Sequence, residues 1–208
     1  MKLYHGTSSR YLDDILKNGI RPREQTGNSN WKGSVISKKG FVYLTTAYPV
    51  YFAFSAVDKD ADLLVIETEV DEKNLYPDED YIAMCLHKHD EKFKHMDLKD
   101  VNKFVNPEEY KEYWEASYKH NGNVCHKGII KSSQIVRHVI IPRDEFGVIM
   151  SIGGDSMPIP INYMIQGELY RNYMKVLFNK GLDGIKKALQ KQQKKYEKMF
   201  KEAQLNRI

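Results

Sequence analysis

The sequence predicts an α+β fold, with small, mainly antiparallel sheets around a cleft and helices on the outside. Two observations predict it. Strand and helix patterns alternate over the first 70 residues, and another strand pattern follows late, at residues 134–141. With 208 residues, 41% of them hydrophobic and 29% charged, the chain can bury the core of one globular domain and carry an appendage.

The chain opens with a strand pattern at residues 2–4 and a helix pattern at residues 10–18. Ser8 or Ser9 is a natural N-cap for this helix, because a serine hydroxyl can accept a hydrogen bond from a free backbone N–H of the first turn. Gly19 follows the last helical residue, where glycine commonly ends a helix. The pattern therefore predicts a strand, a turn and a helix before residue 20.

The middle of the chain supplies the remaining elements of the expected core. Residues 24–40 are polar and rich in turn-forming residues, which predicts a loop over the cleft. Residues 41–45 are expected to form a strand, and 48–57 a helix with proline in its first turn. Residues 63–70 are apolar enough to indicate a mostly buried strand.

The second half of the chain is expected to be largely helical. Residues 74–80 form a turn-rich acidic segment, and residues 81–120 are charged and helical in pattern, with an interruption near Pro107. We therefore expect a domain over residues 1–145 that contains a helical insertion at about 81–122. Residues 146–208 are expected to form a C-terminal extension that ends in a basic amphipathic helix.

The basic charge is concentrated in that extension. Residues 184–208 hold seven Lys and one Arg against two Glu, a net charge of +6, so the rest of the chain sums to −2. The simplest interpretation is a helix packed on the body with its lysines in water. The alternative is an electrostatic footprint for nucleic acid or another acidic partner. A helix on a membrane surface is less favoured, since Gln192 interrupts the apolar face.

Composition narrows the classes of protein that remain. No apolar run approaches the roughly 20 residues that span a bilayer, so no membrane partner is expected. The strand pattern at residues 2–4 leaves no room for a signal peptide, and we expect a cytoplasmic location. Two cysteines, Cys85 and Cys125, predict no disulfide framework. The spacing Cys85-x-His87-x-His89 is unlike that of zinc sites, so no metal is expected.

Three short motifs could surround one planar ligand with an imidazole, a phenol and aromatic rings. They are Tyr4-His5-Gly6-Thr7-Ser8, Gly19-Ile20-Arg21-Pro22 and Val42-Tyr43-Leu44-Thr45. In order and approximate spacing they resemble the split NAD-binding core of the ADP-ribosyltransferase superfamily, specifically its poly-ADP-ribosyl and tRNA 2'-phosphotransferase branches. The resemblance covers the first 70 residues well and residues 128–141 loosely. It implies a split antiparallel β core with surrounding helices, and NAD as co-substrate.

The resemblance also implies a role for each motif residue. His5 would contact the ribose next to nicotinamide, and Gly6, with Thr7 in the same turn, would bind the carboxamide. Tyr43 would stack on the nicotinamide ring, and Arg21 would hold the distal half of the dinucleotide. A second aromatic residue would close the other side of the ring, and its candidates are Tyr51, Phe52 and Phe54, for which core packing is the plainer interpretation of each alone.

One departure from the family concerns its catalytic Glu, which lies on a late strand. In strict register Ser133 stands at that place, with Gln134 beside it, and these two are expected to face the reacting ribose. Another acid could replace the missing charge: Glu67, Glu69, Asp78, Glu79 or Asp80. The first two are interpreted as the solvent face of a strand, and the other three as acids at a helix start.

Three functions follow as expectations. The first is an NAD-dependent ADP-ribosyltransferase that modifies a cytoplasmic macromolecule, protein or nucleic acid, as a toxin or a phage-encoded modifier would. The second is a tRNA 2'-phosphotransferase, in which Arg10, Arg21 and Arg23 would grip the phosphate. The third is a degenerate module that binds NAD or ADP-ribose without turnover, for which the missing Glu is the main support.

Overall fold

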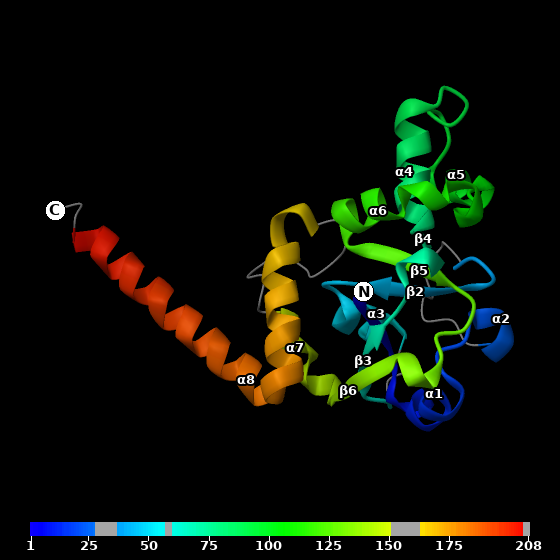
Figure 1. Cartoon of the computed structure of the whole chain (residues 1–208). Helices are drawn as coiled ribbons and strands as arrows, with labels where there is room; N and C mark the ends of the chain where they lie inside the picture. Colours follow the sequence, from blue (N-terminus) through cyan, green and yellow to red (C-terminus); the bar gives the residue numbers. More distant parts are fainter. Residues whose placement is uncertain (28–36, 57–59, 151–162, 206–208) are drawn as a thin grey trace.

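The computed structural model describes residues 1–27, 37–56, 60–150 and 163–205. Its centre is a six-stranded sheet in the order β4-β5-β2-β1-β3-β6, in which all neighbouring strands are antiparallel (Figure 1). The strands are β1 (Lys2–Ser8), β2 (Phe41–Thr45), β3 (Leu63–Glu69), β4 (Leu75–Pro77), β5 (Asn123–Lys127) and β6 (Ile135–Ile141). The expected α+β class with an antiparallel core is confirmed.

The sheet consists of two three-stranded halves that meet at one point. In one half β1 pairs with β3 along its whole length, and β3 pairs with β6. In the other half β5 lies between β2 and β4. The central strands β1 and β2 share a single residue pair, Tyr4 with Thr45. The two halves therefore separate beyond this pair, and the expected two small sheets exist as the halves of one sheet.

Helices surround the sheet and are α1 (Leu12–Asn18), α2 (Arg23–Thr26), α3 (Pro49–Ala56), α4 (Glu79–His89), α5 (Leu98–Phe104), α6 (Trp114–Asn121), α7 (Phe146–Met150) and α8 (Tyr163–Leu205). Short 3₁₀ turns lie between some of the elements, including η4 (Ser132–Gln134) between β5 and β6. Within the part of the chain that the structure describes, no helix combines the length and the apolarity needed to cross a membrane.

Both faces of the sheet are covered by hydrophobic cores, as the alternation along β3 shows. Leu63 and Val65 pack under α3 and α8, whereas Leu64 and Ile66 pack under α1 and α6. A third cluster lies between α4 and α5, away from the sheet. Because β3 is buried on both sides, its sequence reads as one apolar run rather than as a regular alternation of apolar and polar residues.

Helix α3 packs directly on strand β1 at Gly6. A side chain at this position would overlap the carbonyl oxygen of Pro49, the first residue of α3. Glycine is therefore needed for the close approach of helix and strand. This contact fixes the aromatic residues of α3 relative to His5, the neighbouring residue in β1.

Several boundaries differ from those expected. The strands β4 and β5 were not predicted, because residues 75–77 resembled a turn and residues 123–127 showed no alternation. Part of the loop expected at residues 24–40 is helix α2. Residues 28–36 of that expected loop lie outside the described residues. In α8 only Gly181 leaves the helical conformation, with φ 65°, whereas the expected second break at Gly184 is helical.

Two glycines with positive φ differ in whether an added methyl group would meet a neighbouring atom. Gly19 (φ 80°) ends α1, and its added methyl would overlap the carbonyl oxygen of Ile130. Gly40 (φ 84°) has open space around it. We expect Gly19→Ala to lower the free energy of unfolding by roughly 3 kcal/mol or more, and Gly40→Ala by about 1 kcal/mol. Equal costs for the two variants in urea unfolding would contradict the role given to the Ile130 contact.

Candidate active site

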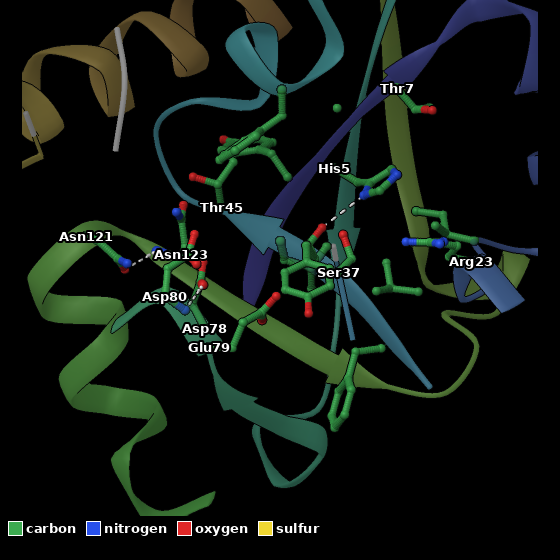
Figure 2. Close-up of a pocket in the computed structure, with 18 of the residues that line it drawn as sticks. His5, Thr7, Arg23, Ser37, Thr45, Asp78, Glu79, Asp80, Asn121 and Asn123 are labelled. Carbon is green, nitrogen blue, oxygen red and sulfur yellow. Dashed lines mark hydrogen bonds between the residues drawn. The ribbon is translucent and has the colours of Figure 1, made fainter. Parts of the chain in front are cut away.

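A cavity of about 630 Å³ opens between the two halves of the sheet, a size within the usual range for small-molecule sites. Its lining comes mainly from β1, β2 and the helices α1, α3 and α4. Of the site residues expected from the sequence, the cavity brings together His5, Gly6, Thr7, Arg21, Tyr43, Tyr51 and Phe52. In Figure 2, His5 and Arg23 lie on one side of it and an acidic group on the other.

His5 is buried in the wall between β1 and β2. Its Nδ1 lies 2.9 Å from the carbonyl oxygen of Tyr43. A carbonyl can only accept a hydrogen bond, so Nδ1 carries the proton and Nε2 is the acceptor nitrogen of the ring. Burial lowers the pKa of His5, which keeps the imidazole neutral near pH 7.

Tyr43 links His5 to the acidic side of the cavity. Its hydroxyl accepts a hydrogen bond from the backbone N–H of Lys38 at 2.8 Å. The carboxyl group of Glu79 lies near the same hydroxyl, so the two groups influence each other's pKa. Burial and the nearby charge of Glu79 raise the pKa of Tyr43 well above its usual value, so the phenol stays protonated and can donate.

Glu79 is the first residue of α4, and its side chain is aimed into the cavity (Figure 2). The residue is 3% exposed, and its Oε2 has no hydrogen-bond partner among the described residues. Burial, and then the charge of Asp78, raise the pKa of Glu79 well above its usual value. A buried carboxyl oxygen without a partner is costly, and it is the kind of group that a ligand satisfies.

Two more carboxyl groups flank Glu79. Asp78 is the N-cap of α4 and accepts a hydrogen bond from the backbone N–H of Asp80 at 2.9 Å. Burial and the charge of Asp80 raise the pKa of Asp78 to about 7. Asp80 accepts a hydrogen bond from Asn102 at 2.8 Å. The acids expected to form a helix start therefore do so, and they also line the cavity.

The opposite end of the cavity is basic. Arg21 and Arg23 both line it, and the Arg21 guanidinium pairs with Asp14 at 2.6 Å. The buried Nε of Arg21 has no hydrogen-bond partner among the described residues. Arg10 is not part of the lining; it lies 3.9 Å from Asp60. The three arginines expected to grip a phosphate are therefore not gathered in one place.

Ser133 and Gln134 do not line this cavity, in contrast to the expectation from register. Both belong to η4, which precedes β6 at the far edge of the sheet from β4. The Gln134 side chain accepts a hydrogen bond from the backbone N–H of Lys131 at 2.9 Å and so closes its own turn. The prediction that Ser133 and Gln134 face the reacting ribose is therefore wrong, because both lie at the opposite edge of the sheet from β4.

The structure also separates the three aromatic candidates of α3. Tyr51 and Phe52 line the cavity, whereas Phe54 does not. The Phe54 ring stacks on Phe146 of α7, with ring centroids 3.8 Å apart. Phe54 is therefore a packing residue between α3 and α7.

The two glutamates of β3, Glu67 and Glu69, lie outside the cavity. Glu67 was expected on a solvent face, but it is 3% exposed and forms ion pairs with Arg137 and, at 3.8 Å, with Lys2. Glu69 is exposed. Neither of these glutamates lines the cavity. Of the acids that could replace the missing charge, only those at the start of α4 reach the cavity. From the sequence, Glu79 was interpreted as an acid at a helix start and not as a residue of the site.

The two cysteines lie in different elements of the fold. Cys85 lies in α4, and Cys125 is buried in β5, where its thiol donates to the carbonyl oxygen of Pro77 at 3.2 Å. In the described ranges, no group of three or more His, Cys, Asp or Glu side chains is arranged to hold a metal ion.

No protein-family model matches the chain, and no curated protein matches its sequence. The geometry of the cavity is therefore the main basis for a functional assignment.

The raised pKa of Asp78 makes the stability of the protein depend on pH. The folded protein keeps the proton up to about pH 7, whereas the unfolded chain releases it near pH 3.8. Stability therefore falls as pH rises from about 4 to about 7. We expect Asp78→Asn, which keeps an N-cap oxygen, to remove this part of the pH dependence, worth at most about 4 kcal/mol. Parallel wild-type and variant curves of urea midpoint against pH would contradict this assignment.

Proposed function

We propose that the protein is an NAD-dependent ADP-ribosyltransferase that modifies a cytoplasmic macromolecule. The observation that carries the proposal is the convergence of three groups on one cavity: His5, Tyr43 and Glu79. Two of them are the residues to which the family resemblance gives the ribose and the nicotinamide ring. The third supplies a carboxyl group, which Ser133 and Gln134 cannot supply.

When bound, NAD supplies a cationic nicotinamide that leaves with the bonding electron pair and becomes neutral. Positive charge then develops on the ribose carbon, and a nucleophile of the acceptor forms the new bond there and loses its proton. A buried carboxylate at Glu79 would stabilise this developing charge, because few water molecules compete with it. Tyr43 would hold that carboxylate in place through its hydroxyl, while the neutral His5 would hydrogen-bond the ribose through Nε2.

The raised pKa of Glu79 is compatible with this role. Without a ligand, burial and the charge of Asp78 favour the protonated form of Glu79. A cationic ring placed beside Glu79 favours the carboxylate instead, because an opposite charge lowers the pKa of an acid. The carboxylate would then be available where positive charge develops.

Two other functions considered from the sequence receive less support. A tRNA 2'-phosphotransferase would need a cluster of basic groups for the phosphate, but Arg10 lies outside the cavity and Arg21 pairs with Asp14. A module without turnover was supported mainly by the missing catalytic Glu. The carboxyl group of Glu79 in the cavity speaks against such a module.

We expect Glu79→Gln to reduce NAD turnover about a hundredfold or more, because the amide removes the countercharge but keeps the shape. NAD affinity measured by calorimetry should change only a few-fold. Release of nicotinamide, with and without cell lysate as a source of acceptor, is the activity to measure.

Ser133→Glu and Gln134→Ala are the matched controls, because both positions lie outside the cavity. Their turnover should equal that of the wild type. A rise of NAD hydrolysis in Ser133→Glu, or full activity in Glu79→Gln, would contradict the assignment of Glu79.

The same assignment predicts that NAD binding is accompanied by proton release, since burial raises the pKa of Glu79 and the bound cation favours its charged form. Calorimetric titrations in two buffers of different ionisation enthalpy measure this release. Glu79→Gln should abolish the release, and Asp78→Asn should keep most of it. Equal proton release in the wild type and in Glu79→Gln would show that another group titrates.

A further inference from the structure

The distal part of α8 forms an arm that extends away from the body (Figure 1). The helix is broken at Gly181, and Ile185 then packs into the core that α8 shares with α3. Gln192 is the last anchor that we identify, because its side chain accepts a hydrogen bond from the Tyr173 hydroxyl at 2.7 Å. Beyond it Met199 is 53% exposed. The helix that was expected to pack on the body does so through Ile185 and Gln192, and its last turns extend away from the body.

The arm carries one continuous basic face, formed by Lys187, Lys191, Lys194, Lys195 and Lys198. At 3.6 residues per turn these five positions fall within an arc of about 100° over roughly 16 Å of helix. All five side chains are exposed. Among the described residues, only Lys198 of the five has a carboxylate partner, Glu202 at 3.8 Å. The face is therefore a row of cations with little internal compensation.

We propose that this basic face binds the phosphate backbone of nucleic acid. The proposal rests on charge complementarity and does not depend on the activity of the cavity. Nucleic acids carry phosphates at regular intervals of a few ångströms, which a row of cations of similar length can neutralise with release of counterions. A lysine ammonium is a point charge that meets phosphate in many orientations, so the binding would be independent of sequence.

Two other partners fit the face less well. A protein interface usually depends on buried aromatic or apolar anchors, and the basic face itself contains none. A membrane-surface helix would need a free apolar face opposite the lysines. On that side, Ala188 and Leu189 pack against the body and Gln192 is held by Tyr173, so a free apolar face begins only beyond Gln192, at the exposed Met199.

The test uses the full chain and fluorescently labelled random-sequence probes of about 20 nucleotides, single-stranded and duplex. Anisotropy titrations at several salt concentrations give the slope of log K against log salt. Contacts from three to five lysines predict a slope of about −2 to −5, from about −0.7 per phosphate for single strands and −0.9 for duplex.

The arm variant combines Lys191→Gln, Lys194→Gln and Lys198→Gln, since glutamine has a helix propensity close to that of lysine. It should bind more than tenfold more weakly at low salt and reduce the steepness of the slope by about 2 or more. The control variant makes the same charge change at three exposed lysines of the body, Lys73, Lys88 and Lys119, and should keep the wild-type slope. Circular dichroism checks that the helix remains.

Three results would overturn the proposal. The first is equal binding by the arm and control variants, which would assign the effect to net charge. The second is no binding of either probe by the wild type at low salt. The third is binding to phosphatidylserine vesicles in the absence of nucleic-acid binding, which would identify the arm as a membrane-surface element.

Discussion

The cavity depends on the separation of β1 and β2. These two central strands share only the pair Tyr4 and Thr45, and beyond it the continuous backbone ladder of a regular sheet is absent. The imidazole of His5 bridges the gap instead, through its hydrogen bond to the carbonyl oxygen of Tyr43. A side chain thus replaces a backbone donor between the strands. The separation of the two strands leaves the space that a ligand would occupy.

The elements near the start of the chain could be predicted because their signals are local. The strand at 41–45 and the helix beginning at Pro49 have clear boundaries, and Gly19 marks the end of α1 as expected. Strands β4 and β5 lack such signals. Strand β4 has three residues and contains Pro77, which is tolerated at a sheet edge, while β5 is buried along most of its length and shows no alternation.

The position of the Glu79 carboxyl group in the cavity could not be predicted either, because no local signal in the sequence determines it. Ser133 fits a strand-and-turn pattern, but the pattern does not tell where its strand lies in the sheet. The order of strands places β6 at one edge and β4 at the other. Glu79 follows β4, so it reaches the cavity from the side of β5 and β2, whereas η4 lies beyond β3. Only the long-range pairing of strands separates these two candidates.

The close contact of Gly6 with Pro49 has a consequence for genetic experiments. Every side chain at this position would push α3 away from β1, so variants at Gly6 would reduce the amount of folded protein as well as any activity. At His5, the preceding residue, the two effects can be separated, because its role in the cavity lies in its side chain. A mutational scan that reports abundance and activity together would therefore class these neighbours differently, although both line the same cavity.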